Sequence, residues 1–216
     1  MNRGRKVFQI ACIAGCALLL AATLRSPLYP REQWLQHVPT AVALPALLLA
    51  ARRQWMSDLS MVCLATMLGL HILGARWIYS YVPYEQWCKA AFGSSPSGWF
   101  GWSRNHYDRL VHLAFGLLMT LPLAEAARRY VQTGVANALA FAWLAVAGAS
   151  ALYEVFEWAL AVIAAPDFAE KYNGQQGDFW DAQKDMALAM AGSSIAVFAI
   201  AIAWKRKEEV NNVGAK

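Results

Sequence analysis

The sequence predicts an all-α, polytopic membrane protein, a bundle of six transmembrane helices forming a single integral membrane domain over residues 1–216. Apolar residues make up 58% of the chain and charged residues only 15%, whereas soluble domains carry about 25% charged residues. The apolar residues gather in runs long enough to cross a bilayer, which takes roughly 20 residues of helix. These runs show no period-two alternation, and lipid admits only helices or closed barrels. Disordered chains, collagens and ordinary soluble enzymes are therefore excluded.

Each predicted helix is an apolar run bounded by charged or turn residues. In chain order the six runs span 7–24, 35–51, 59–75, 110–127, 135–165 and 186–204. The first begins after Lys6, the second ends before Arg52, and the third ends before Arg76. The fourth begins after Arg109, and the sixth ends before Lys205. The fifth, at 31 residues, is long enough to tilt or to project beyond the bilayer.

The basic start of the chain also resembles a secretory signal peptide, because Arg3, Arg5 and Lys6 precede an apolar run. That run is 18 residues long, and no clear small-x-small cleavage site follows it. We therefore expect an uncleaved first helix.

Lys and Arg residues set the predicted orientation, because they collect in cytoplasmic loops. The two termini and the loops after the second and fourth helices hold 11 of them, and the remaining loops hold 8. Both termini are therefore expected in the cytoplasm. The formal charge of +5 is spread between the apolar runs and forms no basic stripe, so no nucleic-acid partner is expected.

The long outer loop over 76–109 is rich in Trp and Tyr. Such rings favour the headgroup zone, so the loop is expected to lie against the outer membrane surface. Cys88, in this loop, is the only cysteine outside the predicted helices, so no intrachain disulfide is expected. The aromatic residues are Trp77, Tyr79, Tyr81, Tyr84, Trp87, Trp99, Trp102 and Tyr107.

Ionisable residues lie at one level, near the outer ends of several helices, and each such residue in a membrane is a candidate functional residue. Asp108 and His112 begin the fourth helix and, being four apart, share a face. Glu154 and Glu157 lie near the outer end of the fifth helix, about 60° apart. The last outer loop supplies three carboxylates that lead into the sixth helix, Asp178, Asp181 and Asp185.

Each of these faces continues through small residues, which transmembrane helices use for close packing. The faces are therefore expected to point into the bundle, where the acidic and imidazole groups would meet. The small residues are Gly116 and Thr120, Ala147 and Ser150, and Ala189 and Gly192.

Simpler roles stay open for some of these residues. Asp178 and Asp181 suit the N-terminal cap and first turn of the sixth helix, where carboxylates complement free N–H groups. Asp108 also suits an ion pair with Arg104 or Arg109.

Glu125 is interpreted as structural, because Arg128 and Arg129 follow it at three and four residues. The remaining histidines have no distinctive spacing and are expected to be structural or interfacial: His37, His71 and His106.

Two kinds of chemistry suit this set of side chains. A divalent cation is one, because imidazole and carboxylate groups bind zinc or manganese, and oxygen ligands alone bind magnesium or calcium. The expected metal ligands are His112, Glu154, Asp181 and Asp185. Acid–base catalysis by carboxylates that share protons is the other. The candidate catalytic residues are Asp108, His112, Glu154, Glu157, Asp181 and Asp185. The candidate ligand-binding residues are Arg104, Arg109, Asp178 and Lys184.

Three motifs, read together, resemble the YjdF-type bacterial inner-membrane proteins over about residues 70–192. This resemblance implies a small multi-pass inner-membrane protein and brings no assigned activity, substrate or cofactor. The motifs are Arg104-Asn-His-Tyr-Asp-Arg-Leu-Val-His112, Tyr153-Glu-Val-Phe-Glu-Trp158 and Gly174-Gln-Gln-Gly-Asp-Phe-Trp-Asp-Ala-Gln-Lys-Asp-Met186.

A weaker likeness is to VanZ-like proteins, which are associated with glycopeptide resistance. Asp108-Arg-x-x-His112 resembles their Asp-Lys-x-x-His helix start, with Arg109 in place of Lys. Asp185-x-x-x-Ala189-x-x-Gly192 resembles their Asp-x-x-x-Asn-x-x-Gly, with Ala189 in place of Asn.

Three functions follow as hypotheses. The first is an outward-facing carboxylate and histidine site that binds or processes a lipid or envelope-precursor headgroup, with or without a divalent metal ion. The second is a proton- or ion-coupled transporter, although the charges cluster at one end and not at the bilayer midplane. The third is a structural or accessory membrane protein whose rim closes the bundle with salt bridges. Membrane lipids are the expected partners, and a homodimer is an open alternative.

Overall fold

The computed structural model describes residues 3–163 and 176–214, and every regular element in this part of the chain is a helix. Six helical stretches are long and apolar enough to cross a membrane, which confirms the predicted fold class. The helices are α1 (Arg3–Thr23), α2 (Pro30–Gln36), α3 (Val38–Arg53), α4 (Asp58–Arg76), α5 (Tyr84–Phe92), α6 (Pro96–Phe100), α7 (Tyr107–Ala126), a π-helical turn (Ala127–Val131), α8 (Val135–Ile163) and α10 (Asp181–Gly214).

The observed helices differ from the predicted runs mainly at their ends. The second run begins five residues early, as the short helix α2, because Pro30 has the fixed φ angle that suits a first helical turn. The fifth run is observed to Ile163, and its predicted last two residues lie outside the described part of the chain. Helix α10 spans 34 residues, about 51 Å, so it is much longer than the roughly 30 Å hydrocarbon core.

The outer loop is partly helical, which the sequence analysis did not predict. Helices α5 and α6 lie within it, and Glu85 of α5 joins them by accepting hydrogen bonds from the Ser97 backbone N–H at 3.2 Å and hydroxyl at 2.9 Å. Ser95 caps α6 by accepting a hydrogen bond from the Gly98 N–H. Aromatic side chains of both helices remain exposed, including Phe92 and Phe100. This exposure fits the predicted contact of the loop with the membrane surface.

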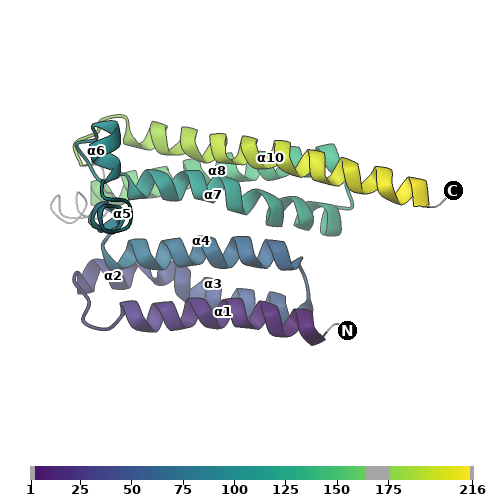
Figure 1. Cartoon of the computed structure of the whole chain (residues 1–216), viewed down its shortest axis with the longest axis horizontal. Coiled ribbons are helices and arrows are strands. Elements are labelled where there is room, and N and C mark those ends of the chain that lie inside the picture. The colour runs from purple at the N-terminus through teal and green to yellow at the C-terminus, as the bar shows by residue number, and fades with distance from the viewer. Residues whose placement is uncertain (1–2, 164–175, 215–216) are drawn as a thin grey trace.

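The helices form two groups that lie side by side (Figure 1). Helices α1, α3 and α4 pack together around a core that includes Ile13, Leu47, Met61 and Ile72. Helices α7, α8 and α10 form the second group, and α4 packs on α7 between the groups. Both ends of the chain lie at the same end of the bundle, and α5 and α6 cover the opposite end (Figure 1).

Small residues bring α7 and α10 into close contact, as their sequence pattern predicts. A Cβ atom added at Gly116 would lie 2.0 Å from the Ala189 carbonyl oxygen, and one added at Gly192 would lie 2.2 Å from the Leu113 carbonyl oxygen. The hydroxyls of Thr120 and Ser193 are hydrogen-bonded across this contact at 2.8 Å. The start of α10 is therefore held at a fixed position beside the start of α7.

Glu125, near the end of α7, stabilises the opposite end of the bundle. Its carboxylate accepts hydrogen bonds from the Ser57 backbone N–H at 3.0 Å and the Ser60 hydroxyl at 2.8 Å. The predicted pairing with the two following arginines is wrong, because Arg128 stacks on Trp204 and Arg129 donates to backbone carbonyls near the start of α4. The predicted structural role of Glu125 holds, with a different partner.

Candidate functional site

The candidate site lies at the end of the bundle opposite the two chain ends, where α7 and α10 begin (Figure 1). Asp108 and His112 occupy the first turns of α7. Glu154 and Glu157 lie on α8, and Asp185 lies in the first turns of α10. Three helices thus supply the carboxylates and the imidazole.

The segment before α7 is held by hydrogen bonds from two other parts of the chain. The Gln176 side-chain amide bonds the Asn105 backbone twice, accepting from its N–H at 3.0 Å and donating to its carbonyl at 3.1 Å. The Asn105 side chain donates to the Val82 carbonyl at 2.9 Å, and the His106 N–H donates to the Tyr84 hydroxyl at 2.8 Å. These bonds fix the positions of the side chains that follow.

The outer layer of the site is a network of ion pairs, here called the rim cluster. Arg104 donates to Asp181 at 2.6 Å, and Arg109 lies 3.3 Å from the same carboxylate. Arg109 also donates to Asp178, and Lys184 donates to Asp178 at 2.6 Å. Three cationic side chains thus surround two carboxylates, so the rim cluster has a net positive charge.

Charged neighbours shift the protonation of the groups in this layer. Hydrogen bonds from Lys184, from the Trp180 backbone N–H and from Arg109 hold the pKa of Asp178 well below its usual range. The bond from Trp180 is a local turn bond that lies before the start of α10, so it does not cap this helix. Burial lowers the pKa of His106, and the positive charge of Arg109 lowers it further.

Beneath the rim lies the inner cluster, defined as Asp108, His112, Glu154, Glu157 and Asp185. The His112 Nε2 atom is 3.8 Å from an Asp108 oxygen and 3.6 Å from a Glu154 oxygen. These separations are longer than direct hydrogen bonds. One ligand atom each from Asp108, His112 and Asp185 lie within 4.8 Å of one another. The His112 imidazole therefore lies near both carboxylates without a direct hydrogen bond to either.

The inner cluster is buried and short of hydrogen-bond donors. Asp185 is 2% exposed, and His112 and Glu154 are 8% and 9% exposed. One buried oxygen of Asp185 and one of Glu154 accept no hydrogen bond in the described part of the chain. Leaving such an oxygen unsatisfied costs about 1–3 kcal/mol, and more if it is charged. The cluster therefore suits a bound cation or shared protons.

The structure divides the predicted site residues between these two layers. Arg104, Arg109 and Lys184 pair with Asp178 and Asp181 in the rim cluster. The alternative of an ion pair between Asp108 and an arginine is not among the ion pairs of residues 3–163 and 176–214.

Among the predicted metal ligands, His112 and Asp185 belong to the closest group of ligand atoms, and Glu154 lies beside His112. Asp181 instead faces the arginines of the rim cluster, and Asp108 completes the closest group.

Comparison with known proteins assigns the family. The family described as "Predicted membrane protein (DUF2238)" matches residues 8–207. The chain is also 34% identical over 174 residues to the inner membrane protein YjdF of Escherichia coli (strain K12), covering 78% of this chain and 77% of that protein. The chain belongs to the DUF2238 family. The resemblance to YjdF-type proteins is thereby confirmed, and this DUF2238 protein is a multi-pass inner-membrane protein. No solved structure matches it.

Three residues that position the site in this DUF2238 protein were not predicted. Tyr84, Asn105 and Gln176 hold the start of α7 by hydrogen bonds to backbone atoms. Asn105 and Gln176 lie within the motifs that carry the family resemblance, which was the available signal. A single sequence does not reveal such contacts, because each joins segments at least 22 residues apart.

Proposed function

We propose that this DUF2238 protein binds a divalent cation in its inner cluster and uses the cation to hold the anionic headgroup of a lipid or envelope precursor. The observation that carries this proposal is the pair of buried carboxylate oxygens, on Asp185 and Glu154, that lack a hydrogen-bond donor. A cation held by Asp108, His112 and Asp185 would satisfy the Asp185 oxygen directly and would lie close to the Glu154 oxygen, which is 3.6 Å from the His112 Nε2 atom.

The ligand types and distances support a cation. Manganese and zinc accept imidazole nitrogen together with carboxylate oxygen. Metal–ligand bonds of about 2.1 Å hold neighbouring ligand atoms roughly 3–4 Å apart, and the atoms of Asp108, His112 and Asp185 lie within 4.8 Å of one another. Small side-chain rotations would close this difference. Three protein ligands would leave coordination positions open for an oxygen from a second ligand.

The charge of the rim cluster supports an anionic second ligand. Its three cationic side chains exceed its two carboxylates, and they lie directly outside the inner cluster. Arginine suits phosphate and carboxylate groups because its planar donors can bond two oxygens at once. An approaching headgroup would compete with Asp178 and Asp181 for Arg104 and Arg109.

The proposed orientation places this site on the periplasmic side. Both chain ends lie at the other end of the bundle (Figure 1), and the excess of Lys and Arg favours that end for the cytoplasm. Cys88, on α5, offers a test. A membrane-impermeant maleimide should label it in intact cells with a permeable outer membrane, and labelling only after lysis would reverse the orientation.

The cation proposal is tested by Mn²⁺ binding to the purified protein in detergent, followed by isothermal titration calorimetry. The wild type should bind one ion per chain at pH 7. His112→Ala and Asp185→Asn should each weaken binding by about tenfold or more, because each removes one ligand. Glu209→Gln is the matched control, since Glu209 is an exposed carboxylate at the far end of α10. Equal binding by all four proteins would refute the proposal.

The structural alternative has one specific observation in its favour, which is that the rim cluster joins the start of α7 to α10 through ion pairs. If that joining were the whole role, Asp181→Asn would destabilise the protein and Asp185→Asn would leave Mn²⁺ binding at its wild-type level. The titration above therefore separates the two functions.

A further inference from the structure

A cavity of about 340 Å³ lies next to the inner cluster, between the two groups of helices. Its walls come from α3, α4, α7 and α8 and from the turn after α4. Met67, Val111 and Phe115 give it an apolar body. Asp108 and His112 line it as well, so the cavity and the inner cluster share two residues.

The polar groups of the cavity are concentrated where it meets the inner cluster. The exception is His71, whose Nε2 donates to the Gln36 carbonyl at 2.9 Å and whose Nδ1 lies 2.6 Å from the Tyr79 hydroxyl. That imidazole therefore has both ring nitrogens bonded within the protein. Ser150 faces the cavity with a buried hydroxyl that has no hydrogen-bond partner in the described residues. The cavity thus offers an apolar body whose wall also holds a buried hydroxyl and two ionisable groups of the inner cluster.

The turn after α4 is shaped to close one wall of this cavity. Ile78 and Tyr79 have φ angles of 44° and 57°, a left-handed conformation that is unfavourable for side chains of this size. This turn places the Tyr79 ring over Gly74, where an added Cβ atom would lie 2.7 Å from the ring. Glycine is required at this position by the close approach of the ring.

The cavity has an opening towards the membrane. Ala149 and Tyr153 line it and are exposed on the surface of α8. Because α8 is one of the six candidate membrane spans, we expect this opening to face lipid. A ligand can therefore enter sideways from the bilayer, which favours a lipid over a free water-soluble anion.

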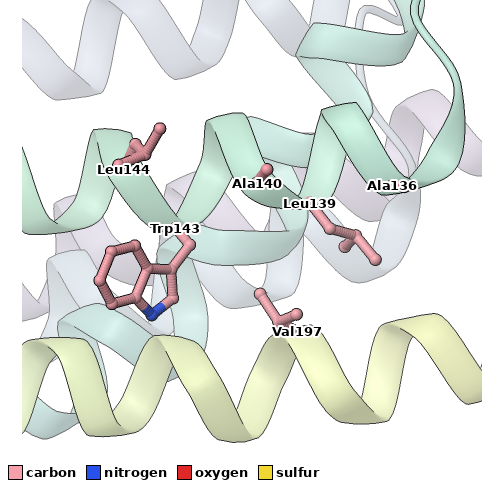
Figure 2. Close-up of a pocket in the computed structure, with 6 residues that line it drawn as sticks. All are labelled: Ala136, Leu139, Ala140, Trp143, Leu144 and Val197. Carbon is pink, nitrogen blue, oxygen red and sulfur yellow. The ribbon is translucent and has the colours of Figure 1, made fainter.

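A second hollow, unlike this cavity, has no charged residue in its wall. It is a groove of about 530 Å³ between α8 and α10, lined by residues that include Leu139, Trp143 and Val197 (Figure 2). The Trp143 indole N–H donates to the Ser194 hydroxyl at 3.0 Å, so its polar atom is already bonded. The groove lies apart from the inner cluster, and no charged residue lines it. It is suited to contact with lipid tails in general.

We propose that the cavity beside the inner cluster takes the hydrocarbon chain of a lipid amphiphile whose phosphate or carboxylate head ligates the cation. This inference rests on the proposed function, and it names the class of ligand. The volume falls within the roughly 300–1,000 Å³ range of ligand pockets. The chain would leave one apolar medium for another, so it adds selectivity by fit and the head supplies most of the affinity.

Photolabelling tests where the chain lies. The protein is placed in lipid nanodiscs with Mn²⁺ and a dodecyl phosphate that carries a diazirine at its terminal carbon, and the labelled residues are mapped by mass spectrometry. Labels are expected on cavity residues, with Met67 and Phe115 foremost. Unlabelled dodecyl phosphate should compete with this labelling more strongly than ethyl phosphate, which supplies the anion without the chain and is not concentrated in the bilayer.

Two matched variants make the test specific. Ala149→Leu places extra methyl groups in the opening and should reduce cavity labelling about tenfold, as overpacking predicts. Ala161→Leu makes the same change at an exposed position of α8 that does not line the cavity, and it should label as the wild type does. Both variants should bind Mn²⁺ normally, which also shows that they fold.

The outcomes separate this inference from the function on which it rests. Normal Mn²⁺ binding with labels spread over lipid-facing residues such as Leu152, unchanged in Ala149→Leu, would overturn the inference alone. Competition by ethyl phosphate as strong as that by dodecyl phosphate would overturn the role of the chain. Failure of the wild type to bind Mn²⁺ would overturn the proposed function together with the inference.

Discussion

The close contact of α7 with α10 predicts that Gly116→Ala damages both stability and the site. The added Cβ atom would lie 2.0 Å from the Ala189 carbonyl oxygen and 2.6 Å from the Ser193 amide nitrogen. Both atoms belong to the backbone of α10, so no side-chain rotation relieves the clash. The two helices must separate by about 1 Å or more to reach ordinary van der Waals contact. That separation would also weaken the hydrogen bond between Thr120 and Ser193.

The expected cost follows from these two effects. Overpacking of this kind costs about 1–3 kcal/mol, and a neutral hydrogen bond contributes about 1 kcal/mol more. For a chain of this size, each 1 kcal/mol lowers the melting temperature by about 2–4 °C. The melting temperature of Gly116→Ala should therefore lie roughly 5–15 °C below that of the wild type, because the shift in melting temperature scales with the loss of unfolding free energy. The assay is thermal unfolding in detergent, followed by size-exclusion chromatography of the remaining monodisperse protein.

A matched glycine provides the control. Gly148, on α8, has nothing within 4 Å of an added Cβ atom, so Gly148→Ala should melt at or slightly above the wild-type temperature, because alanine favours helix. Because Asp108 and Asp185 lie on the two helices that separate, Gly116→Ala should also weaken Mn²⁺ binding. Equal melting temperatures for the two variants would refute the close approach of α7 and α10.

Three further outcomes follow from the structure, each measured as a change in unfolding free energy. Gly74→Ala should cost about 1–3 kcal/mol, since the new methyl group meets the Tyr79 ring, and wild-type stability would contradict the position of that ring. Glu125→Ala should cost roughly 1.5–3 kcal/mol, because it removes a charged acceptor from two hydrogen bonds at the start of α4; no loss would mean that those bonds are absent. The pKa of Asp178 is lowered in the folded protein, chiefly by Lys184, so its contribution is present above the unfolded pKa of about 3.9 and is lost as the pH falls below it. The wild type should therefore exceed Asp178→Asn in stability at pH 7, and an advantage that grew on acidification would contradict the ion pairs.

The sequence predicted the helices well because membrane crossing imposes length and composition on each one. It also predicted that Gly116 and Gly192 lie between helices, since small residues at helical spacing have few other uses in lipid. The ends of helices were less predictable, because a local feature such as the fixed φ angle of Pro30 sets them and hydropathy does not.

The division of the site into a rim cluster and an inner cluster could not be predicted from the sequence. Spacing along α7 showed that Asp108 and His112 share a face, but it gave no information on which helix supplies the third group. Arg104 pairs with Asp181, which is 77 residues away in the chain. Asp108 instead lies close to His112 and Asp185. Which carboxylate meets an arginine depends on the fold of the 176–181 segment, and no local pattern encodes that fold.

The central claim is that the inner cluster holds a divalent cation, and anomalous X-ray diffraction from crystals grown with Mn²⁺ tests it most directly. The account predicts one anomalous peak per chain between α7 and α10, about 2.0–2.3 Å from the His112 Nε2 atom and from carboxylate oxygens of Asp108 and Asp185. An ordered site with those three side chains resolved and no anomalous peak among them would contradict it.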